Sequence, residues 1–316
     1  MPEIYVGDRH WPVAAASNLL DALNQAGIAV PYSCRAGSCH ACLVRCVQGE
    51  PADDKPDALA ADKRQQGWRL ACQCRVVEDL TVEVFDPVRD GLPARVSGCD
   101  WLSPTVLRLR LEPERPLRYR AGQHQVLWTS SGVARPYSLA SLPGEDAFLE
   151  FHLDCRRPGA FCDVACTLSP GDMLRLGELR GGALHYDPDW QERPLLLLAA
   201  GTGLGPLWGV LREALRQEHQ GAIHLLHLAH EPGEHYLADE LRRVAEVYPQ
   251  LQVRLFTPDE LRAALGELRL ICRQAVALVC GSPVSVETFA KALYMAGVPR
   301  NRLLADTFAG RGATGG

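Results

Sequence analysis

The sequence predicts a multidomain protein in which an α+β unit is followed by an antiparallel β-barrel and a doubly wound parallel α/β sheet. Three patterns in its 316 residues lead to this expectation. Four cysteines mark a compact unit over residues 1–88, short alternating apolar runs fill residues 94–188, and strands alternate with helices over residues 190–316. A chain of this length is expected to hold two or three hydrophobic cores.

The first unit opens with two short runs, Ile4–Val6 and Trp11–Val13, which predict a hairpin. A helix is expected next, with Ser17 as its N-cap and Gly27 just beyond its end. Residues 80–84 alternate apolar and polar side chains, as a half-buried strand does. The first unit therefore mixes strands with a helix around a cysteine loop.

The cysteine loop has C-x4-C-x2-C spacing, and a fourth cysteine follows well downstream. This is the ligand pattern of a plant-type [2Fe–2S] cluster, in which four thiolates hold two irons. Gly37 supplies the backbone freedom that a tightly wrapped loop needs. A zinc site or a disulfide framework is the alternative, but the second C-x2-C hook typical of zinc is missing. The predicted cluster ligands are Cys34, Cys39, Cys42 and Cys72.

Residues 86–93 are rich in Asp, Pro and Gly and predict a linker. Beyond the linker, short apolar runs are broken by Gly, Pro and Ser, and many short strands at this spacing favour a β-barrel. The clearest predicted strands of this segment cover residues 106–111, 125–128 and 148–153.

From residue 190 the pattern changes to apolar strands that alternate with helices, as in a parallel doubly wound sheet. The predicted strands cover 195–198, 223–228, 252–256 and 275–280, and the predicted helices cover 207–218, 237–247 and 286–296. The glycine-rich stretch 310–316 is expected to be disordered.

Composition excludes several classes of partner. The chain is 47% hydrophobic and 22% charged with a formal net charge of −5, so neither nucleic acid nor an anionic membrane is expected to bind. The longest apolar run, Leu195–Ala200, is far too short to cross a bilayer. The first residues lack the basic-then-apolar pattern of a secretory signal, so we expect a cytoplasmic protein with reduced thiols.

Three further motifs carry binding chemistry. The string Arg135-Pro136-Tyr137-Ser138 offers a guanidinium for a pyrophosphate, an aromatic face for a flat ring and a hydroxyl donor. Residues 201–206 read Gly-Thr-Gly-Leu-Gly-Pro between a predicted strand and a helix. The dinucleotide fingerprint G-x-G-x-x-G is not met, because Pro206 stands where it requires glycine. Residues 280–283, Cys-Gly-Ser-Pro, also connect a strand to a helix.

On these motifs the whole chain resembles the ferredoxin–NADP+ reductase superfamily. More narrowly, it resembles the reductase components of bacterial multicomponent oxygenases that carry an N-terminal plant-type ferredoxin domain. The resemblance implies a β-grasp-like [2Fe–2S] domain, an FAD-binding β-barrel and an NAD(P)-binding α/β domain. It also implies a flavin site in which Arg135 binds the FAD pyrophosphate, Tyr137 lies against the flavin ring, Ser138 lies near the flavin N5, and Pro136 joins them.

A second flavin motif of this family, G-x-x-S, uses backbone N–H groups and a hydroxyl at a helix N-terminus. The matching residues are Gly159 and Cys162, with Asp163 as an alternative alignment. A thiol is a weaker donor than the family's serine, so FAD binding is expected to persist but to be weaker. FMN is the alternative flavin, although FMN relatives tend to carry their ferredoxin domain at the other end.

The resemblance extends to the nicotinamide. The family's G-T-G-x-[AG]-P loop brings the NAD(P)H pyrophosphate close to the backbone at a helix N-terminus, and it matches Gly201, Thr202 and Gly203. The family's C-G-x-P motif has its cysteine beside the nicotinamide ring, and it matches Cys280 and Gly281.

Asp306 and Phe308 stand where relatives have an acidic residue and an aromatic side chain that covers the flavin. The choice between NADH and NADPH depends on the end of the second strand of the sheet, where NADPH users need Arg or Lys. Residues 229–235 contain neither, and Glu231 could accept from a ribose hydroxyl while repelling a 2′-phosphate. NADH is therefore favoured, and a solvent loop with incidental glutamates is the alternative.

The resemblance implies an NADH-dependent electron-transfer reductase. Electrons would pass from NADH to FAD, to the [2Fe–2S] cluster and to a partner oxygenase or hydroxylase, with Ser138 and Cys280 as catalytic residues. Two alternatives stay open: the same electron chain feeding a deoxysugar-forming dehydratase or a small ferredoxin, and a non-enzymatic redox-sensing module. The cysteines outside these motifs are interpreted as packing residues: Cys46, Cys74, Cys99, Cys155, Cys166 and Cys272.

Overall fold

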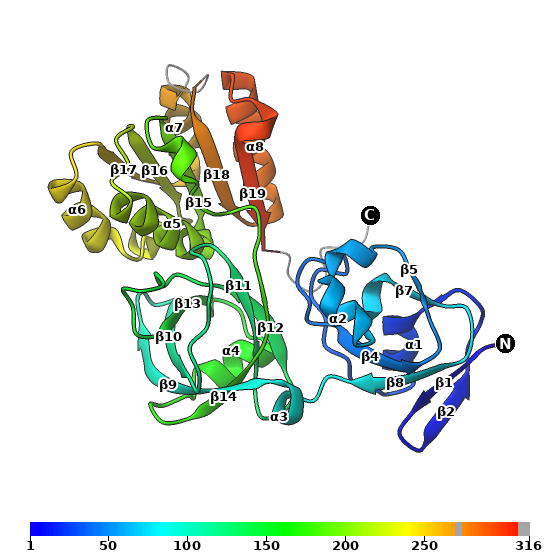
Figure 1. Ribbon diagram of the computed structural model, residues 1–316. Helices are drawn as coiled ribbons and strands as arrows, with labels where there is room; N and C mark the ends of the chain where they lie inside the picture. The colour runs from blue at the N-terminus through cyan, green and yellow to red at the C-terminus, as the bar shows by residue number, and fades with distance from the viewer. Residues whose placement is uncertain (269–273, 309–316) are drawn as a thin grey trace.

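A computed structural model of the protein describes residues 1–268 and 274–308. Its elements fall into three parts, with the N-terminal part beside the other two (Figure 1). Cys272, interpreted as a packing residue, and the stretch 310–316, expected to be disordered, lie outside the described residues. Within the described residues, no helix is long and apolar enough to cross a membrane.

The N-terminal part is built on a five-stranded mixed sheet in the order β2-β1-β8-β4-β6, with a small sheet, β3-β7-β5, beside it. The strands β1 and β2 form the predicted hairpin, and β8 joins β1 in parallel. Apolar side chains of α1 and of these strands form one core. The bounds are β1 (Glu3–Val6), β2 (Arg9–Pro12), β3 (Ser17–Asn18), α1 (Leu19–Gln25), β4 (Leu43–Gln48), β5 (Ala52–Asp53), α2 (Ala61–Gln65), β6 (Trp68–Leu70), β7 (Cys74–Val76) and β8 (Leu80–Val84).

The N-cap of the first helix differs from the one predicted. Asn18, not Ser17, caps α1, and its side-chain oxygen accepts from the backbone N–H of Asp21 at 3.3 Å. Ser17 pairs with Val76 in the small sheet, and its hydroxyl donates to the Ala14 carbonyl. The prediction was wrong because the chain stays extended through Ser17 and turns only after Asn18, which caps equally well.

The predicted linker contains a helical turn. Asp86 accepts from the backbone N–H of Val88 at 2.8 Å and caps α3 (Pro87–Asp90). Proline suits the first position of a helix because its missing N–H has no partner there in any case. Leu92 already begins β9, so the turn formers shape a short ordered connection.

The middle part is a six-stranded antiparallel sheet in the order β12-β11-β14-β9-β10-β13. The two outer strands approach each other beyond β12, because Leu139 bridges Phe151 and the Ala140 N–H donates to the Glu150 carbonyl at 2.8 Å. Phe161 of α4 packs into the core that these strands enclose. The bounds are β9 (Leu92–Trp101), β10 (Val106–Pro113), β11 (His124–Trp128), β12 (Ala134–Ser138), β13 (Leu149–Asp154), α4 (Ala160–Ala165) and β14 (Met173–Arg180).

The C-terminal part is a five-stranded parallel sheet in the order β17-β16-β15-β18-β19. On β15, Leu195 and Leu197 pack with α5 and α6, whereas Leu196 and Leu198 pack with α7 and α8. Helices therefore cover both faces, as the strand–helix alternation predicts. The bounds are β15 (Leu195–Ala200), α5 (Leu204–Arg216), β16 (Ile223–Leu228), α6 (Ala238–Val247), β17 (Leu251–Phe256), α7 (Leu261–Glu267), β18 (Val276–Gly281), α8 (Pro283–Ala296) and β19 (Leu303–Thr307).

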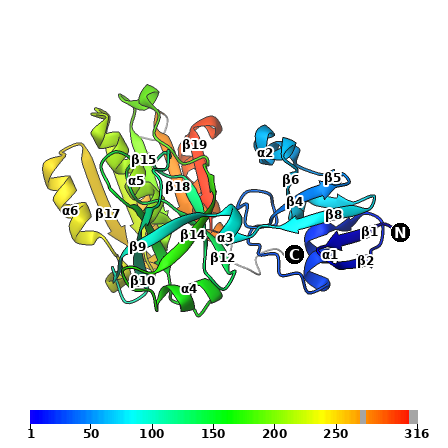
Figure 2. The ribbon, with the colours of Figure 1, turned by 60° about the horizontal axis from the view of Figure 1, so that its bottom comes forward.

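Aromatic side chains join the N-terminal part to the middle part. Phe85, just after β8, stacks on Trp128 of β11 with ring centroids 4.9 Å apart. The N-terminal core also includes Ala134 of β12, so the two parts share apolar contacts. The chain passes from β8 through α3 into β9 at this junction (Figure 2).

Candidate functional site

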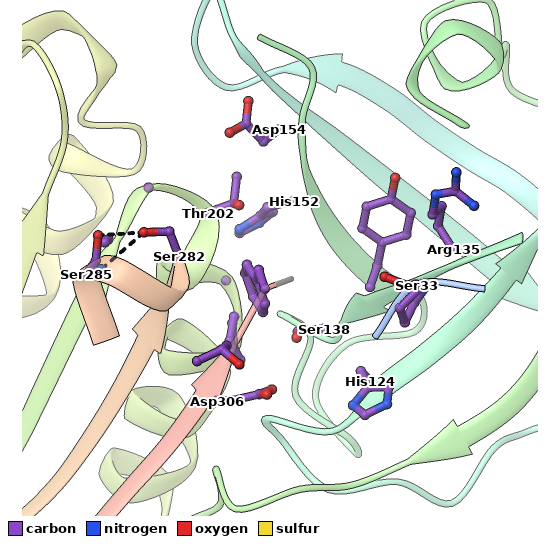
Figure 3. Close-up of a pocket in the computed structure, with 18 of the residues that line it drawn as sticks. Ser33, His124, Arg135, Ser138, His152, Asp154, Thr202, Ser282, Ser285 and Asp306 are labelled. Carbon is purple, nitrogen blue, oxygen red and sulfur yellow. Dashed lines mark hydrogen bonds between the residues drawn. The ribbon is translucent and has the colours of Figure 1, made fainter. Parts of the chain in front are cut away.

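A cavity of about 490 Å³ lies where the three parts meet. Its walls include Cys34 from the cysteine loop, Arg135 from β12 and Thr202 from the turn after β15. Figure 3 shows Arg135 on one side of this cavity and Ser282 and Ser285, at the start of α8, on the other. Segments far apart in the sequence thus share one chamber, which is the candidate functional site.

All four residues of the predicted flavin motif, at positions 135 to 138, border the cavity. They form most of β12, which pairs with β11 so that Tyr137 stands opposite Gln125. The Tyr137 ring packs on Phe161 with centroids 5.0 Å apart, and burial raises the pKa of its hydroxyl well above the usual value. A neutral aromatic ring beside the Arg135 guanidinium fits a flat, negatively charged cofactor such as a flavin dinucleotide.

The predicted nicotinamide loop forms a second wall. Gly201 and Thr202 border the cavity where β15 passes into α5. Gly203 lies behind them, and a Cβ there would stand only 2.3 Å from the Cys280 carbonyl oxygen. Only glycine permits so close an approach of the two loops. The N-terminus of α5, a helix of 13 residues, begins beside this wall and suits a phosphate group.

Cys280 and Gly281 lie at the end of β18 and pack against the loop that follows β15. The Cys280 side chain is fully buried, and burial, together with the charge of Asp306, raises the pKa of its thiol well above the usual value. The predicted place of this neutral thiol beside a nicotinamide ring stays a prediction. Phe308 does border the cavity, and its backbone N–H donates to the Gly281 carbonyl at 2.9 Å.

Two histidines that no motif reveals also border the cavity, His124 of β11 and His152 of β13. His124 hydrogen-bonds the backbone of Ser38 in the cysteine loop, and burial lowers its pKa. His152 Nε2 donates to the Glu150 carboxylate at 3.0 Å, and that carboxylate also accepts from Arg110 at 2.7 Å. The His152 Nδ1 atom is left buried with no hydrogen-bond partner among the described residues. A bound cofactor could supply the hydrogen-bond partner that this atom lacks.

The four predicted cluster ligands are arranged as two pairs of cysteines. The Cys39 thiol hydrogen-bonds the Cys34 sulfur, which lowers the pKa of Cys34 to about 4. The Cys42 thiol hydrogen-bonds the Cys72 sulfur, which lowers the pKa of Cys72 to about 7. Within the described residues, no group of three or more His, Cys, Asp or Glu side chains could hold a single metal ion. Two pairs fit two irons with two thiolates each better than one tetrahedral zinc.

Backbone and amide donors surround the sulfurs of these pairs. The N–H groups of Ala36 and Cys39 both point at the Cys34 sulfur, each at 3.3 Å. The Gln73 side-chain amide donates to the Cys72 sulfur at 3.2 Å. Such donors favour negatively charged sulfur, so the loop fits an anionic iron–sulfur cluster.

Arg180 at the end of β14 links the middle part to the cysteine loop. Its Nε donates to His40 Nε2 at 3.1 Å, and its Nη2 donates to the Ala58 carbonyl. Burial, together with the Arg180 charge, lowers the pKa of His40 to about 3, so the ring stays a neutral acceptor. A second link joins Lys63 to Glu178 at 3.0 Å.

Like Gly203, Cys280 and Gly281, three further predicted cofactor-binding residues do not line the cavity. Glu231 is exposed, whereas its neighbour His230 borders the cavity. Gly159 precedes α4, and Cys162 lies within that helix. The Cys162 sulfur hydrogen-bonds the Tyr137 hydroxyl, so Cys162 contacts the flavin motif from behind.

Two family models match separate segments of this chain. Residues 7–77 match a family model described as a 2Fe–2S iron–sulfur cluster binding domain, which spans the four predicted ligands. Residues 197–291 match a model described as an oxidoreductase NAD-binding domain, which spans the glycine loop and the Cys280 turn.

Two known proteins are similar over almost the whole chain. Reductase component 2 of terephthalate 1,2-dioxygenase from Comamonas sp. is 30% identical, with 99% of this chain and 98% of that protein covered. The ferredoxin–NAD(P)+ reductase component of the naphthalene 1,2-dioxygenase system of Pseudomonas putida is 28% identical, with 96% and 97% covered.

Solved structures show the same architecture. The crystal structure of a cytochrome P450 reductase from Amycolatopsis has a TM-score of 0.67 at 27% identity, covering 98% of this chain and 99% of that one. The ferredoxin reductase of carbazole 1,9a-dioxygenase has a TM-score of 0.64 at 22% identity, covering 97% and 98%. The expected mixed α/β multidomain fold is thereby confirmed.

Proposed function

Since this chain belongs to the reductase components of bacterial oxygenase systems, we propose that it carries electrons from NADH to an oxygenase or hydroxylase partner. The observation that supports this best is the shared cavity. Cys34 and Cys39 border the same chamber as the flavin motif and the glycine loop. When bound, NADH supplies a hydride, FAD accepts two electrons together and releases them singly, and the [2Fe–2S] cluster delivers single electrons.

In this proposal the chain's own residues bind and orient the cofactors. The cysteine pairs at 34/39 and 42/72 would hold one iron each. Arg135, Tyr137 and Ser138 border the cavity: Arg135 would neutralise the flavin pyrophosphate, the Tyr137 ring would lie against the flavin, and the Ser138 hydroxyl would donate near its N5. Thr202 and the N-terminus of α5 would hold the nicotinamide pyrophosphate, and His152 Nδ1 would offer a hydrogen-bonding group in the same cavity.

The finer architecture belongs to the same proposal. We interpret the N-terminal mixed sheet with α1 as a β-grasp-like fold, and the six-stranded sheet as a barrel whose outer strands meet at the bridge between Leu139 and Phe151. The proposed limits, 1–88, 94–188 and 190–316, fall near α3 and near the 3₁₀ turn Pro188–Trp190.

NADH is the proposed donor because the stretch 229–235 contains carboxylates and no Arg or Lys. Arg156 does border the cavity, but it lies 3.6 Å from the Glu234 carboxylate and 3.7 Å from that of Asp154. These carboxylates weaken its attraction for a 2′-phosphate.

The proposed function is tested by anaerobic turnover of purified protein with NADH and NADPH in turn, with cytochrome c as a one-electron acceptor. We expect bound flavin, iron and acid-labile sulfide. We also expect kcat/KM to be about tenfold or more higher with NADH, because placing like charges together costs several kcal/mol. If the protein holds flavin and the iron–sulfur cluster but does not oxidise NADH, the proposed enzyme activity is contradicted and a redox-sensing module is favoured. NADH-driven turnover of an oxygenase that requires this chain would identify the partner class.

Removal of the Arg180 link is expected to slow only electron transfer to the cluster. Arg180→Met leaves His40 Nε2 buried without its donor, which costs about 1–3 kcal/mol. We expect cytochrome c reduction to fall about tenfold. A loss of about 1.4 kcal/mol lowers by a factor of ten the equilibrium constant for keeping the cysteine loop in contact with the middle part. NADH-dependent ferricyanide reduction, which draws on the flavin, should keep its rate.

The matched control for this prediction is Lys63→Met, which removes the partly exposed pair with Glu178. Such pairs contribute at most about 1 kcal/mol, so its effect should be much smaller. If Arg180→Met lowered cytochrome c reduction and ferricyanide reduction equally, general destabilisation and not a positioning role would explain the loss.

A further inference from the structure

Three cysteines outside the cavity meet behind the flavin motif. Cys155 directly follows β13, Cys162 lies in α4, and Cys166 is the C-cap of that helix. Residues four apart share one face of a helix, so Cys162 and Cys166 both face the end of β13. The Cys162 thiol donates to the Asp154 carbonyl at 3.3 Å, which places its sulfur beside the backbone of Cys155, and the Cys155 side chain interacts with both helix thiols. Side chains interpreted from the sequence as separate packing residues thus form a cluster of thiols.

The cluster makes one sulfur nucleophilic. Interaction with the Cys155 thiol and, to a smaller extent, with the Tyr137 hydroxyl lowers the pKa of Cys162 to about 7, so the proton that Cys162 donates to the Asp154 carbonyl is lost near neutral pH. The contact with Cys162 raises the pKa of Cys155, which remains a thiol. Cys155 and Cys162 are half-buried and Cys166 is exposed, so small solutes reach the cluster. A thiolate near neutral pH beside a second thiol is typical of peroxide-sensitive cysteines.

We propose that Cys155 and Cys162 are an oxidation site at which a hydroperoxide forms a disulfide. The Cys162 thiolate attacks one oxygen of hydrogen peroxide, the O–O bond breaks, and the products are a sulfenic acid and, after protonation, water. The Cys155 sulfur then attacks the sulfenic sulfur, an S–S bond forms, and a second water leaves with the Cys155 proton. Two thiols and one peroxide therefore give one disulfide and two waters.

Cys155, not Cys166, is the resolving thiol in this proposal. Of the contacts that lower the pKa of Cys162, the one from Cys155 is the largest. A metal site fits less well, because within residues 1–268 and 274–308 no group of three or more metal-ligating side chains is suitably arranged. Cys166 is therefore a neighbour of the reacting pair and provides a matched control.

Oxidation is expected to weaken flavin binding through Tyr137. Once Cys162 is in a disulfide it is no longer an anionic acceptor, so the buried Tyr137 hydroxyl loses its partner. We expect the flavin dissociation constant to rise about tenfold. This consequence depends on the proposed role of Tyr137 in flavin binding, whereas formation of the disulfide does not.

The test exposes the holoprotein to hydrogen peroxide, alkylates free thiols, and maps cysteine peptides by mass spectrometry. We expect a Cys155–Cys162 linkage that is lighter than the thiol pair by the mass of two hydrogens and that dithiothreitol reverses. Cys155→Ser should stop at a sulfenic acid that dimedone traps, whereas Cys166→Ser should still form the linkage. Cys155→Ala takes the place of the serine variant if the latter loses flavin or iron before oxidation.

Failure to find this linkage in the unaltered protein would overturn the proposal, and so would a Cys162–Cys166 linkage in its place. Flavin release is measured separately, by fluorescence of the filtrate after oxidation. A mapped disulfide with full flavin retention would overturn the connection through Tyr137 while upholding the oxidation site. The peptide map requires no NADH turnover, so its result is independent of the proposed electron-transfer function.

Discussion

Cys39→Ala is expected to lose iron and acid-labile sulfide, and with them cytochrome c reduction, while NADH still reduces the bound flavin. Cys39 is one of a pair with Cys34, so its loss removes half of the protein ligands of one iron. Alanine supplies no thiolate, and the binding free energy that orders the loop around the cluster is lost with it. Visible absorption spectra check this directly, because the iron–sulfur bands should vanish and the flavin bands remain.

Cys46→Ala is the matched control for this prediction. Cys46 lies in β4, in the same core as the cysteine loop, and burial raises the pKa of its thiol to about 11. Cys46 belongs to neither cysteine pair, so the Cys46 variant should keep its iron. If Cys39→Ala instead reduced cytochrome c at the full rate, the ligand assignment and the order of carriers would both be wrong.

Motifs whose residues lie within one loop or strand could be predicted from the sequence. The cysteine loop carries three ligands within nine residues, so spacing alone indicates the cluster. The flavin motif occupies consecutive positions of β12, and the glycine loop occupies a single turn. In each case the chemistry needs neighbouring residues, and local sequence therefore records it.

Residues that meet only through sheet order could not be predicted. His124 and His152 come from β11 and β13, and no spacing relates them. The alternation of apolar and polar residues did not single out His152, because the first five residues of β13 are all buried. The contact of Cys155 with Cys162 likewise depends on how α4 turns back onto β13, which the local pattern does not record.

Gly203→Ala is expected to raise the KM for NADH by about tenfold or more without changing flavin or iron content. A Cβ at this position would stand 2.3 Å from the Cys280 carbonyl oxygen and 2.8 Å from the Gly281 nitrogen. Both atoms belong to the backbone, so no side chain can rotate away and the loop before α5 must shift. Overpacking of this kind costs about 1–3 kcal/mol, and about 1.4 kcal/mol is a factor of ten in affinity.

Gly266→Ala separates this steric effect from a general effect of alanine. Gly266 lies in α7, where an added Cβ meets nothing within 4 Å, so we expect unchanged kinetics and a stability gain of about 0.5–1 kcal/mol. Stopped-flow flavin reduction at increasing NADH concentration distinguishes lower affinity from a slower hydride step. An unchanged KM in Gly203→Ala would mean that the contact with Cys280 does not position the pyrophosphate loop. Loss of flavin or iron would mean that the shift spreads beyond that loop, because neither the flavin motif nor the cysteine pairs contain Gly203.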